Sequence, residues 1–137
     1  PQGFAFKGSS HYLTDVKKPE KSAAALDLIE RAKKSSPEDP LYVVAVGAIT
    51  NVSNALLIEP SIVKNIVVVW LGGNGHNWAH QREFNYRQDL NASRVIFDSG
   101  VAFVQLPCTP VVTHFTTTVP EMERYVAGQG PIGDYLL

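Results

Sequence analysis

Two short runs of consecutive apolar residues limit the folds that are open to this chain. Residues 66–71 read IVVVWL, and residues 41–47 read LYVVAVG. A strand that faces water on one side alternates apolar and polar residues, whereas a strand of a parallel sheet that is covered on both faces is apolar throughout. Runs of about 4 to 8 residues also have the length of strands rather than of helices. We therefore predict parallel strands near residues 41–46 and 66–71.

Amphipathic helix patterns alternate with these runs, and a third apolar run follows them. The helix patterns occupy residues 20–35, 49–60, 89–100 and 119–130, and the third run predicts a strand near residues 101–106. Strands that alternate with amphipathic helices are typical of α/β domains. We predict a single α/β domain over residues 1–137, with an open, mostly parallel sheet and helices on both of its faces.

Charge, hydropathy and cysteine content exclude several classes of partner. Twelve Lys and Arg against thirteen Asp and Glu leave a net charge of -1, so the chain has no strong field to attract nucleic acid or anionic lipid. The longest apolar run is far shorter than the roughly 20 residues of a membrane-spanning helix. The single cysteine, Cys108, cannot form a disulfide within the chain, as is typical of reducing compartments. We predict a cytoplasmic protein that binds neither nucleic acid nor membranes.

Polar side chains gather directly after the second strand, where residues 73–85 read GNGHNWAHQREFN. Ligands of open α/β sheets bind outside the carboxyl ends of the strands, because the strand-to-helix loops all open there. The loops that follow the other two predicted strands reach the same edge. The sequence therefore predicts a small-molecule site at this edge of the sheet.

Three motifs in a fixed order make this prediction more specific. They are GAITN at 47–51, LGG at 71–73 and EFN at 83–85, followed by Asp89 and an Ala-containing helix. In this order they resemble the inosine-uridine preferring nucleoside hydrolases. The resemblance implies a Rossmann-like parallel fold and calcium-dependent hydrolysis of the N-glycosidic bond of ribonucleosides, an activity of nucleoside salvage. It also implies that the 137 residues are an incomplete, central portion of a longer domain.

The resemblance assigns roles at the sugar to individual residues. Asn77, Glu83 and Asn85 match family residues that hydrogen-bond ribose hydroxyls, and Leu71 matches a residue that lines the sugar pocket. A carboxylate accepts hydrogen bonds and an amide both accepts and donates them, so these side chains suit sugar hydroxyls. Val46 matches the residue whose backbone carbonyl binds calcium in the family.

The catalytic residues of the family have no match among these 137 residues. Family members carry an Asp-rich cluster near the N-terminus, which binds calcium and activates the attacking water, and a further calcium-binding Asp near the C-terminus. Calcium takes six to eight oxygen ligands, and this chain offers one carbonyl. We therefore expect a calcium ion in the full-length protein and none bound by residues 1–137 alone. The expected partner is a small ribonucleoside, and homo-oligomer formation is left open.

The aromatic and imidazole side chains of the polar loop allow more than one interpretation. Trp78 can stack on a nucleobase or pack against the apolar core. His76 or His80 can donate a proton to the departing base, or lie on the surface without a role. Their i, i+4 spacing suits a metal pair only on a helix, which the neighbouring glycines disfavour. Glu83 can also serve simply as a partner of a helix N-terminus or as an anchor of the loop.

Two functions follow from these observations. The first is a nucleoside hydrolase in which this chain supplies the ribose-binding part of the site. The second is a noncatalytic sugar-binding, nucleoside-binding or structural module that keeps the same fold. An Asp-rich cluster after the first strand of the complete protein would favour the enzyme.

Overall fold

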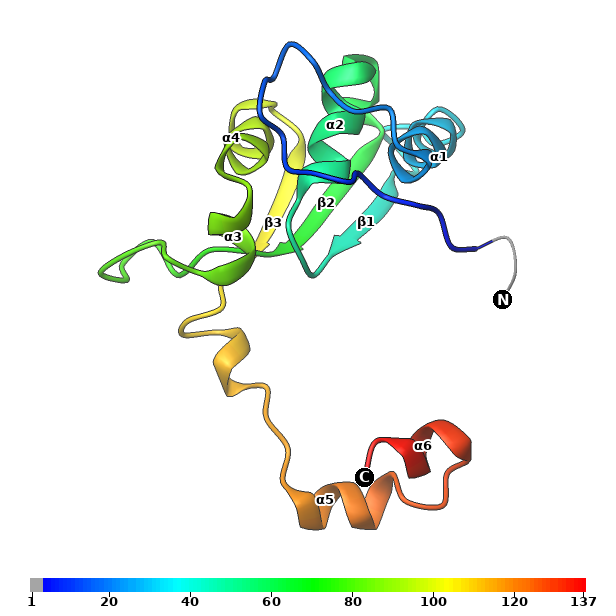
Figure 1. The fold of residues 1–137 in the computed structure, drawn as a ribbon, viewed down its shortest axis with the longest axis vertical. Coiled ribbons are helices and arrows are strands. Elements are labelled where there is room, and N and C mark those ends of the chain that lie inside the picture. The colour runs from blue at the N-terminus through cyan, green and yellow to red at the C-terminus, as the bar shows by residue number, and fades with distance from the viewer. Residues whose placement is uncertain (1–3) are drawn as a thin grey trace.

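Three parallel strands form the centre of the computed structural model, which describes residues 4–137. The strands follow one another in the order β1-β2-β3, and their bounds are Leu41–Ala45 for β1, Ile66–Leu71 for β2 and Ala102–Leu106 for β3. All three predicted strands are confirmed to within one residue at each end, and their carboxyl ends lie at one edge of the sheet (Figure 1).

The register of the sheet sorts the strand residues onto two faces. Leu41 pairs with Ile66, and Val68 pairs with both Val43 and Phe103. Because side chains alternate along a strand, these residues share one face with Trp70, and all of them belong to or pack against the hydrophobic core.

Helices precede, connect and follow the strands. Their bounds are Ala23–Ala32 for α1, Thr50–Ile58 for α2, Phe84–Gln88 for α3, Leu90–Asp98 for α4, Val119–Tyr125 for α5 and Pro131–Tyr135 for α6, with 3-10 turns at Pro60–Lys64 (η1) and Val112–His114 (η2). The helix patterns of the sequence correspond to α1, α2, α4 and α5. Helix α5 ends at Tyr125, before the predicted end at Gly128, and residues 126–128 form a turn in which φ of Gly128 is +73°. The short helix α3 was not predicted.

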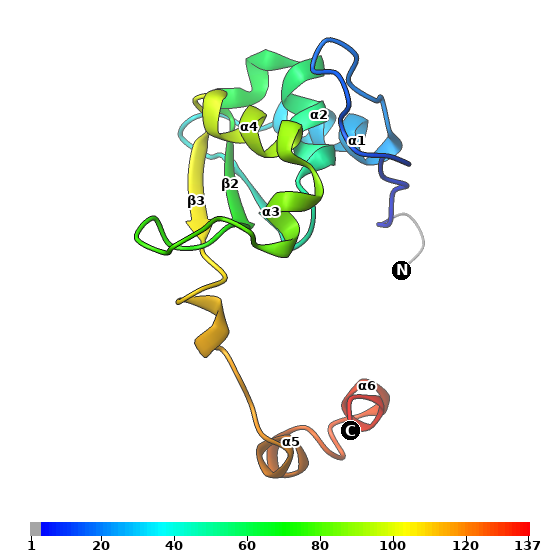
Figure 2. The same ribbon diagram turned by 60° about the vertical axis from the view of Figure 1, so that its left-hand side comes forward.

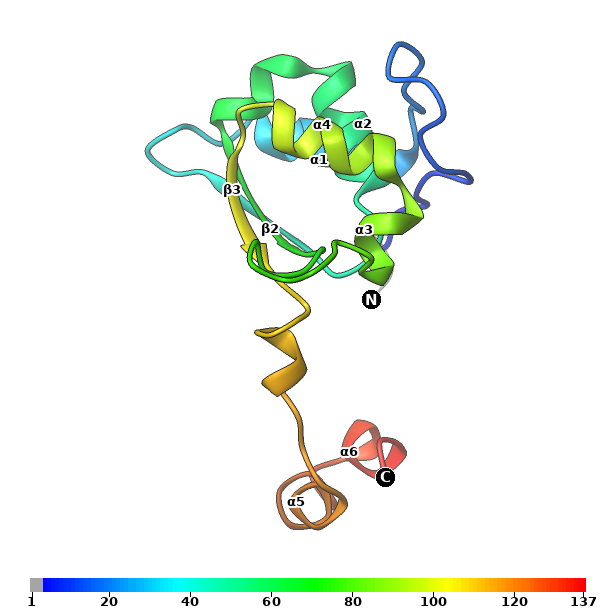
Figure 3. The same ribbon diagram turned by 90° about the vertical axis from the view of Figure 1, so that its left-hand side faces the viewer.

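Within the described residues, α1, α2 and α4 lie on the same side of the sheet (Figure 3). The sequence predicted helices on both faces, and the difference follows from the strand order. Both crossovers step across the sheet in the same direction, and right-handed crossovers of that kind place their helices on the same face. The opposite face carries exposed apolar side chains, including Tyr42 (66%), Val44 (70%) and Val104 (46%). The strands are therefore apolar on both faces although residues 4–137 cover only one of them.

The segment before α1 crosses the helix layer and reaches the amino ends of α2 and α4 (Figure 1). Its Leu13 is buried, and the Leu13 carbonyl accepts a hydrogen bond of 2.8 Å from Asn91. Ser9 donates its backbone N–H to the Asn51 side chain over 2.8 Å. We call residues 9–20 the strap, since these bonds hold it across the helices.

The chain after β3 runs away from the sheet, so that α5 and α6 lie apart from the other helices (Figure 1). Thr118 and Glu121 form a capping box at the start of α5, and hydrogen bonds from Thr118 hold the pKa of Glu121 below its ordinary value. Large apolar side chains of these helices, such as Ile132 (78%) and Tyr135 (88%), are exposed. None of the helices formed by residues 4–137 is long and apolar enough to cross a membrane.

Candidate functional site

Helix α3 lies just beyond the carboxyl end of β2, beneath α4 (Figure 2). Tyr86 of α3 stacks on Trp70 with ring centroids 6.2 Å apart and an angle of 19° between the rings. The indole Nε1–H of Trp70 donates to the Gly47 carbonyl over 2.8 Å, which joins the ends of β1 and β2. Gly72 makes room for this ring, because a Cβ at that position would collide with it. The aromatic pair thus fixes α3 against the sheet edge that the sequence predicted for the site.

Glu83 is the N-cap residue of α3 and is buried. Its Oε1 accepts the N–H of Asn85 over 3.0 Å, and its Oε2 accepts the N–H groups of Tyr86 and Gly73, each over 2.9 Å. A carboxylate has about four lone-pair positions, so these three bonds leave one position on Oε1 unfilled. The helix-capping interpretation of Glu83 is therefore confirmed, and this geometry leaves room for a single further hydrogen bond.

We predict that Glu83→Gln lowers the free energy of unfolding by about 1 to 3 kcal/mol, because the new amide group would face buried N–H donors that lose their acceptor. Urea denaturation followed by circular dichroism measures the change. Glu123→Gln, at an exposed glutamate on α5, is the matched control and should shift stability by less than about 0.5 kcal/mol. Equal stability of the two variants would contradict the anchoring role of Glu83.

The Asn85 side chain is anchored to the end of β2. Its Nδ2 donates to the Leu71 carbonyl over 2.9 Å, and the residue is half-buried. An amide nitrogen has two N–H groups and the amide oxygen has two lone pairs. Asn85 therefore keeps one amide N–H and its amide oxygen free of the bond to Leu71, in an orientation set by the strand.

The polar loop between β2 and α3 is folded by residues that the sequence did not single out. Buried Asn74 donates from Nδ2 to the His80 carbonyl (3.0 Å) and from its backbone to Gln81 Oε1 (2.8 Å). Its Oδ1 accepts the N–H of Thr109 over 3.2 Å, and Gln105 donates to the Gly72 carbonyl over 2.9 Å. Asn74 contacts residues six and seven positions further along the chain as well as Thr109, and Gln105 contacts Gly72, 33 residues away, so no single spacing in the sequence marks either residue.

The remaining predicted residues of the loop are exposed. Asn77, His76 and His80 are exposed, and Trp78 is 46% exposed, so Trp78 does not pack in the core. Within the part of the chain that the structure describes, no hydrogen bond joins Asn77 to Glu83 or to Asn85. The structure therefore brings Leu71, Glu83 and Asn85 together. Asn77 lies apart from them, on the exposed loop before α3 that also carries Trp78 and the two histidines.

The described residues do not by themselves form a calcium site. Val46, immediately after β1, is 73% exposed and offers one backbone carbonyl. Across residues 4–137, no three His, Cys, Asp or Glu side chains come together in a way that could hold a metal ion. Since calcium requires six to eight oxygen ligands, this donor set does not fit the ion.

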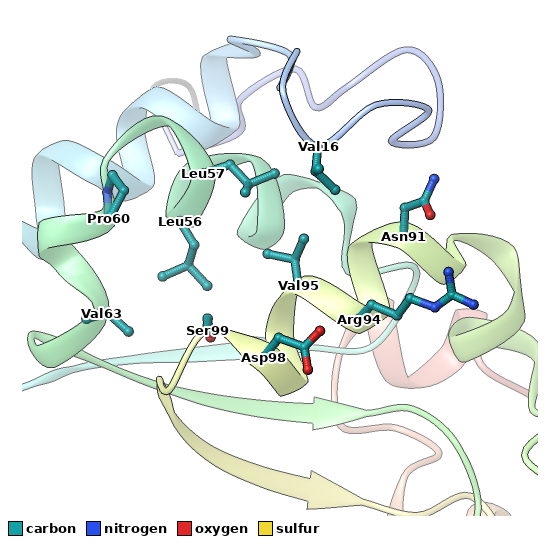
Figure 4. A pocket seen from close by; sticks show the side chains of 10 residues that line it. All are labelled: Val16, Leu56, Leu57, Pro60, Val63, Asn91, Arg94, Val95, Asp98 and Ser99. Atoms are coloured by element: carbon teal, nitrogen blue, oxygen red, sulfur yellow. The ribbon is translucent and has the colours of Figure 1, made fainter.

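A groove of about 670 Å³ lies on the helix layer, between α2, η1 and α4 (Figure 4). Leu56, Leu57, Val63 and Val95 give it a mostly apolar lining. Val63 lies just before β2 and Ser99 lies just before β3, so the groove reaches the amino ends of these strands. It is therefore separate from the site at the carboxyl ends.

Comparison with known proteins identifies the family. The sequence model of the inosine-uridine preferring nucleoside hydrolases matches residues 2–136. The chain belongs to this family. This nucleoside hydrolase chain is 32% identical over 115 residues to the pyrimidine-specific ribonucleoside hydrolase of Citrobacter koseri, a match that covers 81% of the chain and 36% of that enzyme. It is 35% identical over 105 residues to a pyrimidine-specific ribonucleoside hydrolase of Escherichia coli, covering 69% of the chain and 31% of that enzyme.

Solved structures of nucleoside hydrolases have the same fold. The purine-preferring ribonucleoside hydrolase of Gardnerella vaginalis aligns with a TM-score of 0.76 and 23% identity, over 96% of this chain and 50% of that one. The inosine-uridine preferring nucleoside hydrolase of Bacillus anthracis aligns with a TM-score of 0.61 and 19% identity, over 79% of this chain and 37% of that one. The nucleoside hydrolase chain described here thus spans half or less of each of these relatives.

Proposed function

We propose that the complete protein hydrolyses the N-glycosidic bond of ribonucleosides and that residues 71–85 hold the ribose. The observation that carries this proposal is the anchoring of the Asn85 amide on the Leu71 carbonyl over 2.9 Å, at the carboxyl edge of the sheet of a nucleoside hydrolase chain. The bond sets the direction of an amide that retains a donor and an acceptor, which is what adjacent sugar hydroxyls require.

Each residue near the sugar has a distinct part in this proposal. Asn85 donates to one hydroxyl and accepts from another, while the free Oε1 position of Glu83 accepts a third hydrogen bond. The apolar side chain of Leu71 packs against the sugar ring. Asn77 lies on the loop, and its side chain forms a further hydrogen bond with a ribose hydroxyl when the loop closes over the ligand.

The exposed side chains of the loop suit the nucleobase. We propose that Trp78 stacks on the base, because an aromatic face binds any base without hydrogen-bond readout. His80 or His76 donates a proton to the departing base, since a protonated imidazole can act as a general acid. The loop therefore supplies base contact while α3 supplies sugar contact.

We further propose that the complete protein binds a calcium ion through the Val46 carbonyl and carboxylates that do not belong to residues 4–137. When bound, such an ion lowers the pKa of a coordinated water molecule and so supplies a nucleophile. The contribution of this chain is to orient the ribose and to exclude water around it. Cytoplasmic location and a part in nucleoside salvage stay predictions from the sequence, and homo-oligomer formation stays open.

A ribose-release assay on inosine and uridine, with and without added calcium, tests the proposal. We expect hydrolysis by the complete protein that is lost with a chelator and restored by calcium. Residues 1–137 alone should show neither turnover nor sub-micromolar calcium affinity in calorimetric titration, because anionic oxygens set calcium affinity. Nucleoside binding without turnover by the complete protein would instead support a noncatalytic binding module.

A further inference from the structure

Asp89 occupies the junction between α3 and α4 and is 3% exposed. Its Oδ2 accepts the Leu13 N–H over 2.8 Å and the Thr50 hydroxyl over 2.6 Å. Its Oδ1 accepts the Ala92 N–H over 3.0 Å, which caps α4. One buried carboxylate thus joins the strap, the first turn of α2 and the first turn of α4.

The segments that meet at Asp89 are the ones that carry the proposed site. Thr50 follows Val46 by four residues, at the end of the turn that leaves β1, and Asp89 follows Asn85 by four residues. The Thr50 hydrogen bond is therefore a short, buried link between the two strand-to-helix connections at the carboxyl edge. Thr50 belongs to the GAITN motif and Asp89 follows the EFN motif, and ribose contact explains neither of them.

We propose that the Thr50–Asp89 hydrogen bond is a positioning device that sets the distance between the β1–α2 turn and the ribose-binding helix α3. This inference rests on the proposed function. A buried carboxylate is stable only when its hydrogen bonds are satisfied, so Asp89 holds its three partners in one arrangement. The reacting bond of a nucleoside lies between a sugar held by α3 and the groups beyond β1, and misplacement of reacting groups by about 1 Å can cost about 100-fold in rate.

The test is a set of substitutions at Thr50 in the complete protein. Thr50→Val keeps the shape of the side chain and removes the hydroxyl, so we expect kcat to fall about 10- to 100-fold, with KM changed by less than about threefold because α3 still binds the sugar. Thr50→Ser restores the hydroxyl and should restore kcat. Thr50→Ala gives a second deletion of the hydroxyl for the case that valine prevents folding.

Ser53→Ala is the matched control, one turn further along α2. Ser53 is also fully buried and donates to the Ala92 carbonyl of α4 over 2.7 Å. Ser53→Ala should lower Tm by about as much as Thr50→Val does, and it should leave kcat unchanged. If Ser53→Ala lowers kcat as Thr50→Val does, the effect is general loosening of α2 against α4, and the proposal is wrong.

Amide hydrogen exchange gives a reading that does not depend on activity. We expect residues 83–89 to lose protection in Thr50→Val and to keep it in both Thr50→Ser and Ser53→Ala. Unchanged protection in Thr50→Val would overturn the positioning role. If the protein hydrolyses no ribonucleoside, the proposed function fails, yet this exchange pattern still decides whether Asp89 couples the two segments.

Discussion

Replacement of Trp70 by alanine is expected to lower the free energy of unfolding by about 3 to 5 kcal/mol. Trp70 is fully buried and lies between Tyr86 of α3 and Phe103 of β3, with centroid distances of 6.2 and 6.4 Å. Alanine would leave a cavity there and would also leave the Gly47 carbonyl without the indole donor. Urea denaturation followed by circular dichroism measures the loss.

The chain offers its own control in the second tryptophan. Trp78 is 46% exposed, so Trp78→Ala should change stability by less than about 1 kcal/mol. Trp70→Phe keeps an aromatic ring against Tyr86 but loses the hydrogen bond and part of the indole volume, so we expect a loss smaller than that of Trp70→Ala. Similar losses for Trp70→Ala and Trp78→Ala would show that the indole of Trp70 does not join α3 to the sheet.

In the complete protein, Asn85→Ala is expected to reduce kcat/KM for ribonucleosides by about 5- to 150-fold. A lost hydrogen bond to a buried hydroxyl costs about 1 to 3 kcal/mol, and about 1.4 kcal/mol corresponds to a factor of ten. Alanine also removes the bond from Asn85 to the Leu71 carbonyl. Initial rates of ribose release at several concentrations of inosine and of uridine measure the change.

Arg87→Ala is the matched control for Asn85→Ala, since Arg87 is exposed on the same short helix. Arg87→Ala should leave kcat/KM within about twofold of the value for the unaltered protein. Surface substitutions away from the core, from helix caps and from buried polar groups change free energies by no more than about 0.5 kcal/mol. A value of kcat/KM that is unchanged by Asn85→Ala for every ribonucleoside tested would remove Asn85 from the sugar site.

The strands could be predicted from the sequence because their signal is local. Six consecutive apolar residues from Ile66 to Leu71 suit few environments other than a covered parallel sheet, and the structure places β2 over the same residues. Helix α3 was missed because its five residues are too few to show a helical period. Its position depends on the stacking of Tyr86 on Trp70, which joins residues 16 positions apart in the chain.

The sequence led to part of the candidate site, and the roles of its residues at the sugar stay predictions. The EFN motif led to Glu83 and Asn85, and the structure places both at the carboxyl edge, beside Leu71. The motif did not reveal that three backbone N–H groups already occupy the Glu83 carboxylate. It also gave no sign of Asn74, which meets Thr109 only when the chain after β3 lies against the loop.

By itself, the sequence determined the α/β class, the three strands and the family, because apolar periodicity and short motifs are properties of neighbouring residues. Only the tertiary structure decided which face of the sheet the helices cover, how Glu83 divides its hydrogen bonds, and that Asp89 joins Leu13 to Thr50. Leu13 and Asp89 are 76 residues apart. A hydrogen bond over such a separation depends on the packing of whole helices, and no local pattern of residue types encodes that packing.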